Sequence, residues 1–347
     1  MGYISTIIST TILLLLTSIS TVVVAQQVSN VPIKILFGSC LHQDKPQPIW
    51  QAMNQEQADL FVLLGDNVYG DTEDMNQLKA KYAKQWSKPG MQIMLANTPT
   101  IGIWDDHDFG ENDAGAAYPQ KEASRQIMLD YFNVPKESLR RTQVDGIYTS
   151  HILTQANIKV QIILPDLRWN RSPLESVGRL KYILNKAPNH LGPYLPSKDE
   201  STTMLGETQW QWLEQQLQQP ADVRILATSL QFLAEFSGWE SWANLPHERA
   251  RFLALLDKYQ IDNLVIVSGD THWSEISQIT RKNAQSLWEM TASGLTEEWK
   301  NVSPNKHRVG RSYAKVNYGV IEFLDRQLTM SIKDVSGGTV MSQTISL

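Results

Sequence analysis

Acidic and imidazole side chains recur in this sequence directly after apolar runs, where they could bind a metal ion. "FVLLGD" ends at Asp66, and "VSGDTHW" places Asp270 and His272 two residues apart, on the same side of an extended chain. "WDDHDFGEND" (104–113) holds five carboxylates and one histidine but no lysine or arginine. Because crowded like charges oppose folding unless a cation neutralises them, these runs indicate a metal site. A solvated acidic loop is the alternative interpretation of 104–113.

The segment 104–113 cannot present every acid to one ion if it stays extended. Alternation along a strand would place Asp106 and Asp108 on one face and Asp105 and His107 on the other. We therefore expect Asp106 to be a ligand and Asp105 to support it or to cap a turn.

The ligand types favour more than one kind of ion. Carboxylates prefer hard cations such as calcium, magnesium or manganese, whereas imidazole and thiolate prefer iron, zinc or copper. The single cysteine, Cys40, is either a metal-bound thiolate or a small buried apolar residue. Two ions about 3.5–4 Å apart are a recurrent device for hydrolysing phosphate esters. The sequence has no G-x-S-x-G motif that would indicate a serine nucleophile.

Short apolar runs of strand character alternate with helical patterns along the chain. Helices are predicted around Met75–Trp86, within 120–132, around Trp210–Leu217, and around Phe252–Tyr259 with Pro246 in the first turn. The predicted strands are 31–40, 59–66, 100–108, 158–168, 222–232 and 262–273, followed by 285–294, 318–325, 327–337 and 339–347.

Near-continuous valine, isoleucine and leucine in the strands predicts a sheet that helices cover on both faces. The alternating helices imply parallel strands in the first part, and the late run of strands implies a second, mostly antiparallel part. Ligands bind at the carboxyl ends of parallel strands. The strand-end residues expected to converge there are Cys40, Asp66, Asp106, Asp166 and Asp270.

Composition indicates an ordered, exported protein. The 347 residues are 42% hydrophobic and 19% charged, with a net charge of −5, which excludes a disordered chain and gives no nucleic-acid-binding patch. The apolar stretch 7–27 fits a signal peptide, although no lysine or arginine precedes it; an uncleaved anchor is the alternative. We predict a signal peptide over 1–25, one domain over 26–347, no stable membrane span after cleavage, and an irregular insertion at 172–206 near the site.

These motifs resemble the alkaline phosphatase D (PhoD-like) family of metallophosphoesterases. The matching segments are "FGSC", "LLGDNVYGD", "WDDHDFGEND", "GDTHW" and, less specifically, "LGETQWQWL" and "ASGLTEEW", across most of residues 35–320. The resemblance implies an α/β calcineurin-like metallophosphoesterase fold, with two packed mixed β-sheets flanked by helices in a four-layer α/β/β/α sandwich. It also implies an exported enzyme that cleaves phosphomonoesters or phosphodiesters of small molecules or lipids.

The same resemblance implies a role for each motif residue. It implies Fe(III) and one or two Ca²⁺ ions as cofactors, although other divalent metals could serve. His107 matches a histidine beside the phosphate that acts as a general acid or stabilises the transferred group. The implied metal ligands are Cys40, Tyr69 and His272 for iron, Asp66 as the bridge, and Asp106 and Asp270 for calcium.

Further positions are pocket candidates. Arg168, in a D-x-R segment with Asp166, is expected to contact phosphate, with a structural ion pair as the alternative. Arg171 is a weaker candidate. The remaining candidates are Ser229, Gln231 and Asn317 as pocket residues, and Trp239, Trp242, Trp273 and Trp299 as an aromatic wall for the leaving group.

The leading hypothesis is an exported phosphoesterase in which a metal-bound hydroxide attacks phosphorus directly. One alternative is a non-catalytic, calcium-stabilised binding protein on the same fold. Another is an iron oxidoreductase, for which the acid-rich second site has no use.

Overall fold

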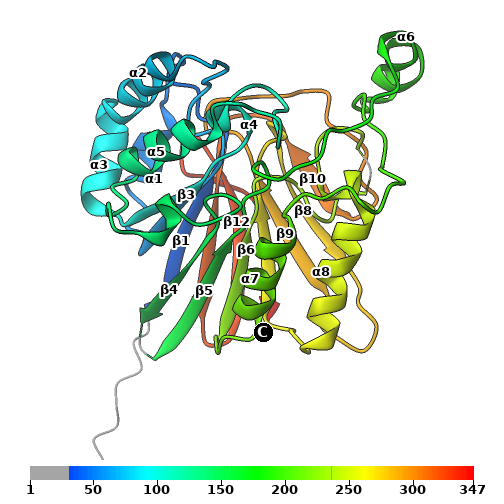
Figure 1. Cartoon of the computed structure of the whole chain (residues 1–347). Coiled ribbons are helices and arrows are strands. Elements are labelled where there is room, and N and C mark those ends of the chain that lie inside the picture. The colour runs from blue at the N-terminus through cyan, green and yellow to red at the C-terminus, as the bar shows by residue number, and fades with distance from the viewer. Residues whose placement is uncertain (1–30, 156, 236) are drawn as a thin grey trace, which may run out of the picture.

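Two mixed β-sheets lie face to face at the centre of the molecule, with helices on both outer sides (Figure 1). The structure is a computed structural model that describes residues 31–155, 157–235 and 237–347, so the predicted signal peptide lies outside the described residues. The first sheet has the order β13 (Thr339–Ser346), β12 (Gln327–Asp334), β11 (Asn317–Leu324), β1 (Ile33–Gly38), β2 (Leu60–Leu64) and β3 (Thr100–Ile103). The second has the order β10 (Arg308–Tyr313), β8 (Ser274–Ile279), β9 (Leu287–Ala292), β7 (Leu264–Ser268), β6 (Val223–Ala227), β5 (Ile158–Leu164) and β4 (Thr149–Gln155).

The helices begin and end at residues that suit those positions. Asp74 caps the second helix by accepting a hydrogen bond from the backbone of Asn76, and Pro246 occupies the first turn of the last helix. The α-helices are α1 (Ile49–Met53), α2 (Met75–Trp86), α3 (Pro89–Asn97), α4 (Asp106–Phe109), α5 (Lys121–Tyr131), α6 (Arg179–Lys181), α7 (Glu207–Leu217) and α8 (Pro246–Lys258). Shorter helical turns are η1 (Leu139–Arg141), η2 (Tyr182–Lys186), η3 (Ala187–Asn189) and η4 (Trp242–Asn244).

Alternation along the buried strands produces four layers. Phe37 on β1 and Ile162 on β5 belong to one apolar cluster between the two sheets. Their neighbours Leu36 and Ile163 point outward, Leu36 toward α1 and α3 and Ile163 toward α7 and α8. Because both faces of each central sheet are covered, the strands read as continuous apolar runs. The predicted four-layer α/β/β/α arrangement is confirmed.

The late strands do not form the separate antiparallel part that the sequence predicted. β11 pairs antiparallel with β1, whereas β9 pairs parallel with β7, so the late strands complete both sheets. Sequence patterns specify which segments are extended, but pairing partners depend on tertiary packing. The predicted strand 100–108 is also shorter: β3 ends at Ile103 and α4 begins at Asp106. The strand alternation expected for 104–113 therefore does not apply.

The predicted irregular insertion at 172–206 is confirmed. It contains only α6, η2, η3 and an isolated β-bridge, and α6 projects from the body of the molecule (Figure 1). Among the described residues, no helix is both long enough and apolar enough to cross a membrane.

Candidate metal centre

The carboxyl ends of parallel strands from both sheets meet at one edge of the molecule. β1, β2 and β3 are parallel to one another, and so are β5, β6 and β7. The turns after four of these strands carry predicted ligands: Cys40 after β1, Asp66 after β2, Asp106 after β3, and Asp270 after β7. Residues far apart in the sequence therefore reach one site because each terminates a strand in a parallel set.

The first group of ligand atoms combines sulfur, phenol, imidazole and carboxylate. The Sγ of Cys40 lies 3.5 Å from Oδ2 of Asp66. The Oη of Tyr69 lies 3.4 Å from the same carboxylate oxygen and 3.0 Å from Nε2 of His272. Ligand atoms of Cys40, Asp66 and His272 all lie within 4.8 Å of one another. The four residues are thus close enough to share one ion.

The second group is made of carboxylates and is joined to the first through Asp66. Asp66 also lies within 4.8 Å of Asp106 and His107, and Asp106 lies equally close to Asp105 and Asp270. Asp66 is therefore the residue that belongs to both groups, which is the position a bridging ligand requires. The structure brings together all six predicted metal ligands.

Four of these ligand residues have left-handed backbones. The φ angles are 61° at Cys40, 50° at Asp66, 69° at Asp270 and 63° at His272. Such conformations cost about 1–3 kcal/mol each in a non-glycine residue and persist where the surrounding structure imposes them. Because these conformations occur together at one edge, we infer that the strained backbone orients these side chains toward a common site.

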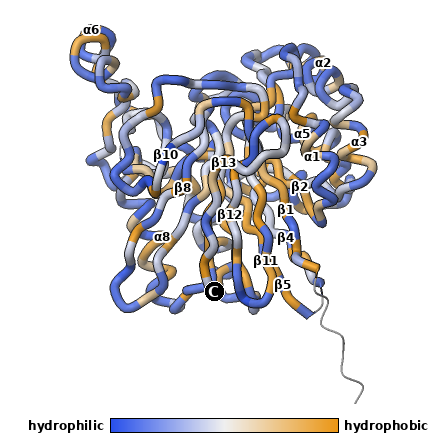
Figure 2. Tube along the Cα trace, turned by 180° about the vertical axis from the view of Figure 1, so that it is seen from behind, coloured by the Kyte–Doolittle hydropathy of each residue, from blue (hydrophilic) through white to orange (hydrophobic). Residues whose placement is uncertain are grey.

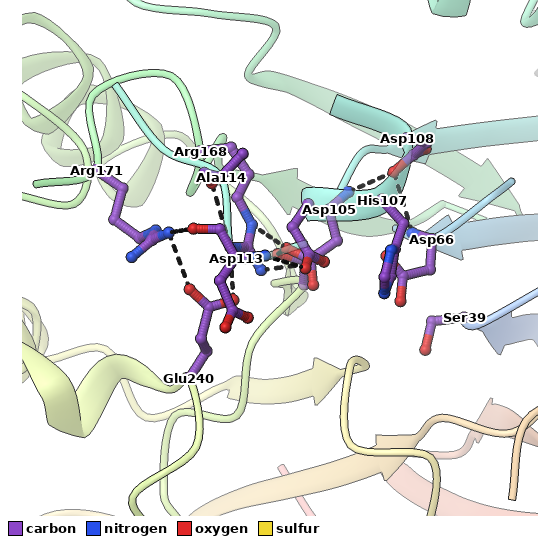
Figure 3. Close-up of polar contacts among 12 residues, drawn as sticks. Ser39, Asp66, Asp105, His107, Asp108, Asp113, Ala114, Arg168, Arg171 and Glu240 are labelled. Carbon is purple, nitrogen blue, oxygen red and sulfur yellow. Dashed lines mark hydrogen bonds and ion pairs between the residues drawn. The ribbon is translucent and has the colours of Figure 1, made fainter. Parts of the chain in front are cut away.

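Asp108 holds the turn that carries Asp66, a role that sequence reasoning missed. Its carboxylate accepts hydrogen bonds from the backbone of Asp105 at 2.7 Å, Asp66 at 3.2 Å and Asn67 at 3.3 Å. It also accepts from the Asn67 amide at 2.5 Å and the Tyr82 hydroxyl at 3.1 Å. Asp108 can do this because it lies inside α4, which directs its carboxylate to the backbones of Asp105 and Asp66 (Figure 3).

Arg168 is fully buried among carboxylates. Its Nε donates to Asp105 at 2.5 Å and its Nη1 donates to Glu240 at 2.6 Å, while Nη2 lies 3.5 Å from Asp106 (Figure 3). Arg171 binds the other oxygen of Glu240 at 3.0 Å. Arg168 does not line the pocket, so its predicted phosphate contact stays a prediction. The observed partners of its guanidinium are three acids and the backbone carbonyl of Ala114.

His107 lines the pocket and is held from behind. Its Nδ1 lies 2.7 Å from Oδ1 of Asp71, which leaves Nε2 for the pocket. The Tyr69 ring packs between the rings of His107 and His42, with centroid distances of 4.2 and 4.7 Å. Neither Asp71 nor His42 was singled out from the sequence, although Asp71 belongs to the "GDNVYGD" motif.

Burial perturbs the ionisation of the site. Desolvation raises the pKa of Asp66, of Asp270 and of the Cys40 thiol, and neighbouring carboxylates raise them further. Asp106 is also desolvated, but the Arg168 guanidinium and His107 lower its pKa to about 2. Although burial alone would lower it, the surrounding carboxylates raise the pKa of His107 to about 11. A bound cation would supply the compensating charge and relieve these shifts.

The arrangement fits cations rather than a purely structural ion network. Six carboxylates (Asp66, Asp105, Asp106, Asp113, Asp270 and Glu240) lie in the candidate groups, against the two guanidinium groups of Arg168 and Arg171. Oδ1 of Asp66, Oδ2 of Asp105 and Oδ1 of Asp106 are buried and accept no hydrogen bond from any residue that the structure describes. Buried polar atoms almost always have a hydrogen-bond or metal partner, so these oxygens indicate that cations bind here. Carboxylates with thiolate and imidazole suit a pair of unlike ions.

A pocket of about 270 Å³ opens over the ligand groups. Trp239, Trp273 and Trp299 line it, together with His107 and Asp270. Three of the four predicted aromatic-wall residues are therefore in place. The exception is Trp242, which is fully buried in the core beside α8 and α7.

Other pocket candidates from the sequence lie behind the site. Asp166 uses both carboxylate oxygens to bind backbone N–H groups and is in none of the ligand groups. Ser229 donates to Asp105 at 2.8 Å. Gln231 and Asn317 are buried in hydrogen-bond networks away from the pocket lining. Asp and Asn cap turns so often that strand-end position alone did not separate these residues from ligands.

Comparison with known proteins agrees with this geometry. A model of the PhoD-like phosphatase family matches residues 35–326. Alkaline phosphatase D of Bacillus subtilis (strain 168) is 23% identical over 289 residues, which are 72% of this chain and 48% of that protein. The chain therefore spans about half the length of this curated relative.

Solved structures share the fold at low identity. A structure of PhoD has a TM-score of 0.70 and 18% identity, covering 92% of this chain and 69% of that one. GAP50, described as the anchor in the inner membrane complex of Plasmodium, has a TM-score of 0.57 and 13% identity, with 91% and 89% covered. A dimetal phosphatase from Danio rerio has a TM-score of 0.53 and 14% identity, with 91% and 99% covered. The expected metallophosphoesterase fold is confirmed, and with a family model matching most of its length this chain belongs to the PhoD-like phosphatase family.

Proposed function

We propose that this protein is an exported, metal-dependent phosphoesterase that hydrolyses phosphomonoesters or phosphodiesters. The observation that carries the proposal is the place of Asp66 in two adjoining ligand groups, one with Cys40 and His272 and one with Asp106. A pair of ions sharing a carboxylate is suited to phosphate esters, whose uncatalysed hydrolysis is among the slowest known reactions. Export of the mature chain after removal of residues 1–25 is part of the same proposal.

The two ligand groups would hold different ions. Cys40, Tyr69 and His272 offer thiolate, phenolate and imidazole ligands that would bind Fe(III), whereas Asp106 and Asp270 suit Ca²⁺, and Asp66 belongs to both groups. When bound, such ions lower the pKa of water and stabilise negative charge on phosphoryl oxygens. Without a serine nucleophile motif in the sequence, we infer direct attack of water on phosphorus.

The protein's own residues orient the substrate and manage protons. His107 faces the pocket with Nδ1 fixed by Asp71, so its Nε2 can donate a proton to the leaving oxygen or a hydrogen bond to the phosphoryl group. Arg168 fixes Asp105 and Asp106 through its buried guanidinium, so we assign it a positioning role. The tryptophans at the pocket mouth would pack against an organic leaving group.

Substitution of Asp66 tests the proposal. Asp66→Asn should abolish hydrolysis of p-nitrophenyl phosphate and bis-p-nitrophenyl phosphate and should lower metal content, because the shared carboxylate is lost. Asp257→Asn is the matched control, since Asp257 is 66% exposed on α8 and its carboxylate contacts only Arg281 among the described residues. Full turnover by Asp66→Asn would refute the bridging role.

Substitution of His107 separates chemistry from metal binding. His107→Ala should lower turnover by roughly 10²–10⁴-fold while metal content stays near that of the wild type, because the histidine acts on substrate. Equal loss of metal and turnover would instead make His107 a ligand. Removing the ions with a chelator should abolish turnover of both esters, and a chelator-resistant activity would contradict metal dependence.

A further inference from the structure

The insertion carries an exposed apolar tip. α6, η2 and η3 run continuously over residues 179–189, here called the helical projection, which stands away from the body (Figure 1). Leu180 is 72% exposed, Ile183 is 50% exposed and Leu184 is 63% exposed. Figure 2 shows hydrophobic residues on α6 at the outer end of the molecule. Exposed leucine and isoleucine side chains clustered in one short segment need a physical reason.

The three apolar side chains share one side of the helical projection. Leu180 lies in α6, whereas Ile183 and Leu184 lie in η2, which is a π-helix. Their spacing of i, i+3, i+4 keeps them on one side of the helical projection. Core-facing helices such as α7 and α8 bury their apolar residues at the same spacing, for example Trp210 and Leu213. The helical projection therefore has the pattern of a packed helix without apolar packing on that side within the described part of the chain.

The helical projection is positively charged although the whole chain is acidic. Residues 179–189 contain Arg179, Lys181 and Lys186 and no aspartate or glutamate, against a net charge of −5 for the full sequence. Arg179 and Lys181 flank Leu180 directly. A surface that combines apolar side chains with cations is complementary to the headgroups and outer acyl chains of an anionic lipid bilayer.

Aromatic side chains join the helical projection to the pocket. The Tyr182 ring makes an edge contact with Trp239, with a centroid distance of 6.3 Å, and Trp239 makes one with Trp299 at 5.9 Å. Trp239 and Trp299 line the pocket, so the apolar tip and the pocket mouth are parts of one continuous surface. Tyrosine and tryptophan are the residues that favour membrane–water interfaces.

We propose that the helical projection docks on an anionic membrane surface, with Leu180, Ile183 and Leu184 inserted at the headgroup level and Arg179 and Lys181 against lipid phosphates. Docking in this way would hold the pocket mouth next to the bilayer. A second copy of the chain suits this surface less well, because a symmetric contact would place the same cations opposite one another.

A fluorophore on the tip tests insertion directly. Leu184→Cys can be labelled with an environment-sensitive dye because the native Cys40 is fully buried. Vesicles containing phosphatidylglycerol should shift the dye emission to the blue, and nitroxide-labelled lipids should quench it. The matched control is Leu139→Cys, a leucine that is 79% exposed on η1, which packs against α5 on the side of the molecule away from α6 (Figure 1). The dye on the control residue should report no change even if the apolar residues 1–25 bind the vesicles, because Leu139 lies away from the helical projection.

Charge removal tests the choice of an anionic surface. Each cation near such a surface contributes about fivefold in affinity, so Arg179→Gln with Lys181→Gln should weaken vesicle binding of the labelled protein roughly 25-fold. Vesicles of phosphatidylcholine alone should give the same weak response as the double variant. The thermal unfolding midpoint should stay the same, because both side chains are at the surface.

Three outcomes would overturn the proposal. The first is equal spectral change at Leu184 and Leu139, and the second is equal response to anionic and neutral vesicles. The third is concentration-dependent dimerisation in solution that Leu180→Ser and Leu184→Ser abolish, combined with no response to vesicles. That result would assign the tip to a second copy instead.

Discussion

Asp108→Asn is the sharpest test of how the metal-binding turn is built. One carboxylate oxygen, Oδ1, accepts from the backbones of Asp66 and Asp105, while Oδ2 accepts from the backbone and side chain of Asn67 and from Tyr82. In the Asp108→Asn variant one carboxylate oxygen is replaced by an NH₂ group, which cannot accept the hydrogen bonds that this oxygen accepts in the wild type. If the NH₂ group replaces Oδ2, Tyr82 can rotate to accept, but both bonds from Asn67 are lost.

The cost follows from those two bonds. Burial raises the pKa of Asp108 to about 7 in metal-free protein, and bound cations nearby would keep the carboxylate ionised. Hydrogen bonds to a charged group are worth about 1.5–3 kcal/mol each, so Asp108→Asn should lower the free energy of unfolding of metal-loaded protein by about 3–6 kcal/mol. Most domains have only about 5–15 kcal/mol in total, so the variant should fold but with a markedly lower urea midpoint. Metal affinity should fall as well, because the backbone of Asp66 is no longer fixed.

Urea unfolding of metal-loaded and metal-free protein measures this cost. Asp257→Asn is again the control, since an exposed ion pair is worth about 0–1 kcal/mol. A loss below about 1 kcal/mol in Asp108→Asn, equal to that of the control, would show that Asp108 does not support the turn.

Two further predictions concern groups beside the ligands. Asp71→Asn should lower kcat roughly 10- to 100-fold with little change in KM or metal content, because His107 loses the carboxylate that orients it; unchanged kcat would contradict this role. In metal-free protein, burial and the nearby Glu240 raise the pKa of Asp113 to about 7, so the folded state binds more protons than the unfolded state between about pH 4 and 7. The ionised Asp113 therefore destabilises the folded state increasingly as pH rises. Between pH 5 and pH 8, Asp113→Asn should gain roughly 1 kcal/mol relative to wild type, which is half of the value expected over that pH range because the side chain is partly exposed. Parallel pH profiles of unfolding for the two proteins would contradict this prediction.

The ligands were accessible to sequence reasoning because each follows a strand. Apolar runs ending in Cys40, Asp66 and Asp270 are visible without a structure, and the carboxyl ends of parallel strands meet by geometry. Strand patterns predicted a sheet covered by helices on both faces, whereas the four-layer arrangement was implied by the family resemblance. The pairing of strands was less predictable, because the local sequence pattern of 318–325 does not indicate that this strand pairs with the first one.

The supporting residues were not accessible in the same way. Asp108 and Glu240 act through contacts that exist only after the chain turns, and the acid-rich run 104–113 offered several equivalent carboxylates. The end of the strand at Ile103 determines which of these carboxylates face the pocket. No residue near this position predicts that the strand ends there. Arg168 shows the opposite problem, because a D-x-R segment is compatible with both phosphate contact and burial among acids.

The site is also the polar part of the contact between the two sheets. Asp105, which follows β3 of the first sheet, accepts hydrogen bonds from Arg168 and Ser229, which follow β5 and β6 of the second. Burying so many charges costs free energy unless partners compensate for it, and Arg168 alone cannot compensate for the carboxylates around it. The apolar cluster beneath, with residues such as Phe37 and Ile162, supplies the stability that lets this edge remain charged and strained. Cation binding should therefore strengthen the contact between the sheets at the same time as it completes the site.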